Sequence, residues 1–186
     1  WLNESFAEWA SYMAVSESTK YKNAWTEFNS SRKNWAYLQD QLSSTHPIAV
    51  AMEDLDAVRT NFDGISYAKG ASVLQQLVAH IGRDNFIAGL RKYFAKHAYK
   101  NTELSDLITE LEAACGKDLT AWVNTWLRTA GVNTLRPIIK LDGDKYASVS
   151  VKQEVPPLPL GSKELRPHRL YVGLFDVKGD ALVRRE

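Results

Sequence analysis

The stretch WLNESFAEW occupies residues 1–9, and the rest of the chain is interpreted from it. Its apolar side chains recur every three or four residues, which is the spacing of one face of a helix. The members of this face are Leu2, Phe6, Trp9 and Met13. Glu4 lies off the face. A solvated glutamate on a helix surface is the ordinary interpretation, because charged side chains are mostly exposed. The alternative is a functional carboxylate.

Helical spacing continues through most of the chain. We predict helices over residues 1–16, 25–42, 67–81 and 85–97, from Thr102 to Gly116, and from Asp118 to Gly131, with a short helical turn near 54–58. Asp84, Thr102 and Asp118 are the expected N-caps, and Gly82 and Gly116 are expected to end helices.

After Gly131 the apolar period changes from helical to alternating. We predict a hairpin of strands 137–141 and 146–151 around Asp142-Gly143-Asp144, then a rigid loop holding Pro156, Pro157 and Pro159. A strand over 169–177 and a final strand from Ala181 should follow. The expected fold class is therefore α+β, mainly helical, with a small β region at the end.

Composition excludes several classes of function. The chain has 186 residues and is 45% hydrophobic, which is enough for a sizeable core. Its 23 basic and 22 acidic residues give a net charge of +1, and no basic cluster is interleaved with aromatic side chains, so we expect no nucleic-acid partner. No apolar run approaches the length that crosses a bilayer, so we expect no membrane partner. The expected location is cytoplasmic. Cys115 is the only cysteine and is expected to be a small buried thiol.

A second informative stretch is FDGISYAKGA at residues 62–71. Tyr67 lies at the head of the helix predicted there, followed by an apolar face. One interpretation makes Tyr67 a core aromatic whose hydroxyl is bonded to a backbone carbonyl. The other makes it a functional hydroxyl. His46, His80 and His97 match no metal-ligand spacing and are interpreted as structural.

Together these stretches resemble the aminopeptidase N type zinc aminopeptidases, the gluzincin family. WLNESFAEW is similar to the family's WLNEGFA, with Ser5 where many members have glycine. Tyr67 falls in a YxKGA stretch, and the sequence STHPI at 44–48 lies between the two motifs. The resemblance implies that Glu4 is the third ligand of a catalytic Zn²⁺ and that Tyr67 stabilises the oxyanion. The other two ligands would be the histidines of an HExxH helix before residue 1.

The same resemblance implies a domain organisation and an activity. Residues 1–132 would be the C-terminal helical part of a thermolysin-like catalytic domain, and residues 133–186 part of a β-sandwich, either small or cut short. The parent protein would hydrolyse N-terminal residues from peptides through a zinc-bound water. We expect this fragment alone to be inactive, since HExxH and the amine-binding loop are absent from it.

Two other functions stay open from the sequence. One is a non-catalytic interaction scaffold with the same fold, which an altered HExxH upstream would favour. The other is a helical module unrelated to peptidases. In either case a truncated helical domain should expose apolar surface, so we expect self-association through the Leu2, Phe6 and Trp9 face of the first helix.

Overall fold

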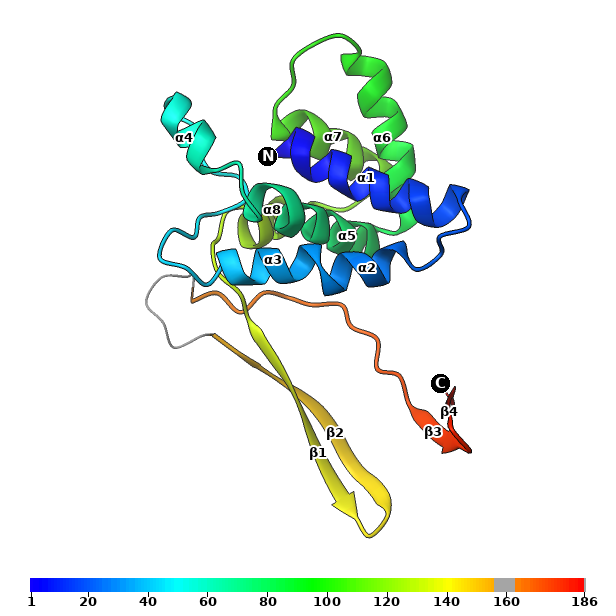
Figure 1. The fold of residues 1–186 in the computed structure, drawn as a ribbon. Helices are drawn as coiled ribbons and strands as arrows, with labels where there is room; N and C mark the ends of the chain where they lie inside the picture. Colours follow the sequence, from blue (N-terminus) through cyan, green and yellow to red (C-terminus); the bar gives the residue numbers. More distant parts are fainter. Residues whose placement is uncertain (156–162, 186) are drawn as a thin grey trace.

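A computed structural model describes residues 1–155 and 163–185, and it confirms the α+β class (Figure 1). The helical elements are α1 (Leu2–Ser18), α2 (Ala24–Ser30), α3 (Arg32–Gln39), α4 (Leu55–Thr60), the π-helical turn η1 (Ile65–Lys69), α5 (Gly70–Ile81), α6 (Arg83–His97), α7 (Leu104–Cys115) and α8 (Thr120–Leu127). The strands are β1 (Thr134–Asp142), β2 (Lys145–Glu154), β3 (Phe175–Lys178) and β4 (Ala181–Arg184). The predicted proline loop at 156–159 lies outside the described residues.

Helix α5 is the centre of the helical part. In Figure 1, α1 lies above α5, and α2 and α3 lie below it. Helix α1 packs against α5, and α3 packs against the adjoining turn η1. Its buried side is made of small and aliphatic residues: Gly70, Ala71, Val73, Leu74, Leu77 and Ile81. Each fully buried large aliphatic side chain contributes roughly 1.5–3 kcal/mol relative to exposure. The apolar spacing that predicts this helix therefore also supplies much of the core.

The single helix predicted over residues 25–42 is wrong, because the chain forms two helices that meet at Ser31. Side chains bond to the backbone carbonyls at the break. The Ser30 hydroxyl donates to the Glu27 carbonyl at 3.1 Å, and the Asn34 amide donates to the Ser30 carbonyl at 2.8 Å. Serine and asparagine compete with the helix ladder in this way. Both helices still bury an apolar residue, Phe28 on α2 and Ala36 on α3.

All three predicted N-caps are displaced by one or two residues. Helix α6 begins after Gly82, so Asp84 lies in its first turn instead. Helix α7 is capped by Glu103 and not by the preceding Thr102. The Asp118 carboxylate does accept a backbone hydrogen bond, from the N–H of Thr120 at 2.8 Å, although the cap position of α8 is the next residue. The sequence thus shows that a polar side chain lies near the start of each helix, but not which residue occupies the cap position.

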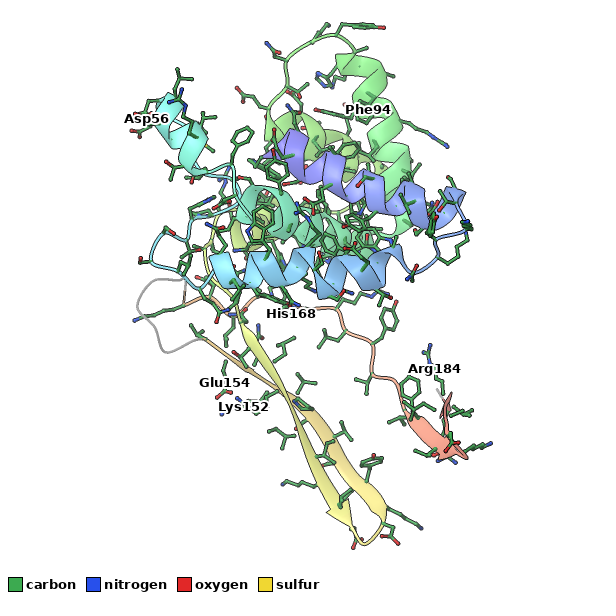
Figure 2. All side chains as sticks on the ribbon, viewed as in Figure 1. Asp56, Phe94, Lys152, Glu154, His168 and Arg184 are labelled. Atoms are coloured by element: carbon green, nitrogen blue, oxygen red, sulfur yellow. The ribbon has the colours of Figure 1, made fainter. Side chains whose placement is uncertain are left out.

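Phe94 is another correction. It shares a helical spacing with the buried Phe86 and Leu90, yet its side chain is 52% exposed. Figure 2 shows Phe94 on α6, and its ring packs against Phe6 of α1 with 5.6 Å between ring centroids. The periodicity identifies the correct face of α6, but α6 extends past the helices that would cover its last turn.

The predicted hairpin is confirmed and is longer than expected. Strands β1 and β2 pair antiparallel from Thr134 opposite Glu154 to Asp142 opposite Lys145, with an irregularity at Lys140/Leu141. Gly143 in the turn has φ 57°, a conformation that glycine adopts without steric cost. Strands β3 and β4 form a second, separate pair.

The predicted strand over 169–177 is too long, because β3 begins only at Phe175. The residues before it lie along the helical part, beneath α3 and α2 in Figure 1. Arg169 of this segment donates to the Ala79 carbonyl of α5 at 2.9 Å. The segment therefore follows the helices instead of pairing with a strand. The described residues contain two hairpins and no closed sandwich, and the division of the chain at 132/133 stays a prediction.

Arg166 connects this segment to the end of α8. Its side chain is 4% exposed, and its guanidinium donates to backbone carbonyls of Thr129, Ala130 and Gly131 at 2.9–3.2 Å. Carbonyls after the last turn of a helix have no partner within the helix and attract cations. Burial lowers the pKa of Arg166, and the charge of Asp40 opposes that shift. None of the helices in the described part of the chain is long and apolar enough for a membrane span.

Candidate functional site

Glu4 lies in the first turn of α1, where a negative charge is favoured by the helix dipole. Its side chain is 21% exposed, so it is largely covered by the rest of the chain. It fits neither a fully solvated surface glutamate nor a residue of the core.

Helix α1 is held in place by polar contacts on two sides. Glu8 accepts two hydrogen bonds from Arg32 of α3, at 2.7 and 2.9 Å, in the bidentate geometry that fixes orientation. Trp9 is buried, and its indole N–H donates to Gln75 of α5 at 2.8 Å. These bonds fix the rotation of α1 about its axis, and with it the direction in which Glu4 leaves the helix.

Tyr67 lies in the middle of η1, the turn that leads into α5. This turn contains an i to i−5 hydrogen bond, from the Lys69 N–H to the Gly64 carbonyl at 2.9 Å. Such π-helical turns are rare and frequently occur at functional sites. The Tyr67 ring contacts Phe62 edge to face at 6.1 Å. Within residues 1–155 and 163–185, no group makes a hydrogen bond to its hydroxyl, contrary to the core-aromatic interpretation.

The start of η1 is fixed by Asp63. Its Oδ1 accepts the backbone N–H groups of Ile65 at 2.9 Å and Ser66 at 3.1 Å, and its Oδ2 is 3.1 Å from Nε2 of His46. Burial alone would raise the pKa of Asp63, but the bonds from His46 and the two backbone groups outweigh it and the pKa is lowered. His46 therefore contacts the residue whose carboxylate fixes the start of the turn that carries Tyr67.

The end of η1 is fixed by Lys69. Its ammonium lies 2.7 Å from Oδ2 of Asp40 on the end of α3, and both side chains are almost fully buried. Asp40 also accepts the N–H of Gly131 at 2.9 Å and the hydroxyl of Thr45 at 2.7 Å. Burial lowers the pKa of Lys69, and Asp40 partly offsets that shift. The carboxylate thus ties η1 to the segment that follows α8.

The two stretches singled out from the sequence are in direct contact. Helix α1 packs against η1, and the hydroxyl of Ser5 donates to the carbonyl of Ser66 at 2.6 Å. Ser5 follows Glu4, and Ser66 precedes Tyr67. The fold therefore brings the backbones of the two candidate residues onto neighbouring turns, while their chemical roles stay predictions.

A metal site needs more ligands than the described part of this chain brings together. Zinc sites use three or four nitrogen, sulfur or oxygen ligands, with three protein ligands in catalytic sites. Among the described residues, no three histidine, cysteine, aspartate or glutamate side chains are grouped closely enough to hold a metal ion. Glu4 fits one carboxylate ligand of such a site and no more. His80 lies in the last turn of α5, and His97 of α6 packs on Tyr93 with 5.4 Å between ring centroids.

A cavity of about 360 Å³ lies elsewhere, between α3, α5, α8 and the segment around His168. Figure 2 places His168 on the segment that runs beneath α3. Lys69 and Asp40 line this cavity, and Glu4 and Tyr67 do not. It is therefore separate from the candidate site, although the ion pair that fixes η1 forms part of its wall.

The sequence analysis did not identify Asp63, Asp40 or Lys69. Asp63 could have been recognised from the sequence, because Asp-Gly-x-Ser is typical of an aspartate that caps the backbone N–H groups two and three residues later. The pairing of Asp40 with Lys69 and Gly131 has no comparable sequence pattern. Asp40 and Gly131 are 91 positions apart along the chain, and no local pattern predicts such a contact.

A family model described as "Peptidase family M1 domain" matches residues 1–126. Aminopeptidase N of Streptomyces lividans is 51% identical over 185 residues, which cover 96% of this chain and 22% of that protein. Tricorn protease-interacting factor F2 of Thermoplasma volcanium is 38% identical over 144 residues, 77% of this chain and 18% of that protein.

Leucyl aminopeptidase of Saccharolobus solfataricus is 35% identical over 154 residues, which cover 83% of this chain and 19% of that protein. The chain thus spans about a fifth of the length of these relatives. The family match includes both stretches of the candidate site and every helix from α1 to α7. We conclude that the chain belongs to peptidase family M1.

Proposed function

We propose that the protein containing this chain is a zinc-dependent aminopeptidase that removes N-terminal residues from peptides. Family membership and relatives named as aminopeptidases support this activity. The observation that carries it to this site is the bond from Ser5 to Ser66, which joins the stretch containing Glu4 to the stretch containing Tyr67. Neither local stretch requires such proximity by itself.

Glu4 is proposed as one carboxylate ligand of the zinc ion. When bound, zinc acts as a Lewis acid toward the peptide carbonyl and the attacking water. The two remaining protein ligands are the histidines that the family resemblance places before residue 1. A single carboxylate does not hold zinc against water, so we expect the 186-residue chain alone to bind none and to hydrolyse no peptide.

Tyr67 is proposed as a hydrogen-bond donor to the oxyanion that forms when the peptide carbonyl is attacked. Its hydroxyl has no partner among the described residues, and its backbone is held by Asp63, Ser5 and Lys69. A donor that is already oriented stabilises developing charge without reorganisation during the reaction. Loss of one such donor typically lowers the rate by about 10²–10³.

The test uses the longer protein, assayed on a panel of aminoacyl-naphthylamides with and without a metal chelator. We expect Glu4→Ala to lose zinc and activity together. Tyr67→Phe should keep zinc while kcat falls by about 10²–10³. Matched controls are Glu53→Ala and Tyr21→Phe, two exposed side chains that should leave both properties unchanged.

Hydrolysis that a chelator does not affect, or full zinc content in Glu4→Ala, would contradict the proposal. A folded protein that hydrolyses none of these substrates would instead favour the interaction scaffold. Zinc content measured by atomic absorption separates loss of the ligand from loss of the oxyanion donor.

A further inference from the structure

Ser5 is a polar side chain that the fold buries completely. Its exposed fraction is 0%, and its hydroxyl donates to the Ser66 carbonyl at 2.6 Å. The two residues are 61 positions apart in the sequence. A buried hydroxyl without a partner costs roughly 1–3 kcal/mol, so this bond is needed wherever serine occupies the position.

The Ser5 side chain lies close against the backbone of Gly70. A Cβ atom placed on Gly70 would lie 1.8 Å from the Ser5 hydroxyl oxygen and 2.7 Å from its Cβ. The absence of a side chain at Gly70 therefore creates the space that Ser5 fills. The hydroxyl is held between the start of α5 and the carbonyl of Ser66.

Ser66 is held from a second direction as well. Its own hydroxyl donates to the Asn61 carbonyl at 2.5 Å, and its side chain is 2% exposed. The backbone N–H of Ser66 donates to Asp63. Ser66, which directly precedes Tyr67, is therefore held by three hydrogen bonds. Of these, the bond from Ser5 comes from the helix that carries Glu4.

We propose that Ser5 is a positioning residue that sets the place of Tyr67 relative to Glu4. This rests on the roles proposed above for those two side chains. The Ser5 hydroxyl is buried in its bond to Ser66 and does not reach a substrate, so it acts through the backbone of η1. Small displacements matter in such a site, because a misplacement of about 1 Å can lower a rate by about 10².

The test uses the full-length zinc enzyme with Ser5→Ala, and Ser11→Ala as the matched control. Ser11 lies on the same helix, is exposed, and bonds only to the Glu8 carbonyl of its own helix. We expect Ser5→Ala to retain zinc and KM and to remain folded with a lowered thermal stability, because the Ser66 carbonyl loses a buried partner, while kcat falls by about 10- to 100-fold. Ser11→Ala should match the wild type in zinc content, thermal stability, KM and kcat.

A second comparison separates positioning from general loosening. If Ser5 acts through the Tyr67 hydroxyl, Ser5→Ala should change kcat by less than about 2-fold in a Tyr67→Phe background, because the group it positions is already gone. An equal loss of kcat in both backgrounds, or an unchanged kcat in the single variant, would overturn the proposal.

The outcomes also distinguish this inference from the proposed function. A Tyr67→Phe variant with full activity refutes the role of Tyr67, and the positioning of that residue with it. A normal loss in Tyr67→Phe combined with no effect of Ser5→Ala refutes the positioning alone.

Discussion

His46 and Asp63 show how a single pair of side chains fixes the turn that carries Tyr67. Both nitrogens of His46 face acceptors, with Nδ1 2.7 Å from the Pro47 carbonyl and Nε2 3.1 Å from Asp63. Burial alone would lower the pKa of His46, but the bonds to Asp63 and Pro47 outweigh it and raise the pKa above its ordinary value. The imidazolium form therefore matches this environment, since it donates from both nitrogens.

This pair should make stability depend on pH. The contribution of His46 is fully present below its unfolded pKa of about 6.5 and is lost as pH rises through the raised folded pKa. The contribution of Asp63 has the opposite sign: it is present above the unfolded pKa and is lost as pH falls through the lowered one. We expect His46→Gln to destabilise the protein more at about pH 5.5 than at about pH 8.5, as measured by urea unfolding.

His80 provides the control. Burial, followed by the charges of Lys117 and Arg169, lowers its pKa, so its neutral form is favoured in the folded protein. His80→Gln should then change the pH dependence in the opposite direction, stabilising the protein at acidic pH relative to the wild type. If the effect of His46→Gln did not vary with pH, the charged pair would be refuted.

The approach of α1 to the start of α5 depends on a glycine. Gly70 is buried at the N-terminus of α5, and the nearest atoms to a Cβ at that position belong to Ser5. Apart from Ser5, the closest atom is a methyl carbon of Ile48 at 3.6 Å, an ordinary contact. Helices α1 and α5 can therefore approach closely at this point because Gly70 has no side chain and leaves room for Ser5.

We expect Gly70→Ala to destabilise the chain by at least about 1–3 kcal/mol, which is the usual cost of overpacking a filled site. In a Ser5→Gly background the same substitution should cost little, because the two clashing atoms are gone and alanine is the better helix former by about 0.5–1 kcal/mol. Urea unfolding of the four variants of this cycle measures the coupling. Equal costs in both backgrounds would show that the strain comes from the backbone of α5 itself.

The exposed apolar surface of the molecule lies on the β1–β2 hairpin more than on α1. Trp9 is buried, and Leu2 and Phe6 are partly covered by the core. The hairpin projects away from the helices in Figure 1, and one of its faces carries Pro137, Ile139, Leu141, Tyr146, Val149 and Val151. An isolated two-stranded hairpin is marginally stable in water. Self-association of the 186-residue chain stays a prediction. We now expect the hairpin face, and not the α1 face, to be the contact surface.

The double variant Ile139→Lys, Val149→Lys should reduce self-association measured by light scattering, because it places two charges on an opposed pair of the apolar face. The matched control is Ser148→Lys, Ser150→Lys, which adds the same charge on the opposite face of β2 and should leave association unchanged. Equal effects of both double variants would indicate simple charge repulsion. An effect of a substitution at Phe6 alone would return the interface to α1.

The local sequence determined the type of most elements. Apolar spacing predicted α1, α5 and α7, and the Asp-Gly-Asp turn predicted the hairpin, because these signals depend only on residues a few positions apart. The same information placed Glu4 and Tyr67 in two stretches typical of a known family. It could not give the break at Ser31 or the exposure of Phe94, which depend on competing side chains and on which helix covers which.

Only the tertiary structure decided how the candidate site is assembled. The bond from Ser5 to Ser66 and the ion pair between Asp40 and Lys69 join residues distant along the chain. Such contacts form when packing brings two helices to one place, and helical periodicity records which face is buried without recording the partner. The sequence thus determined which side chains are available for chemistry, and packing around α5 determined which of them meet.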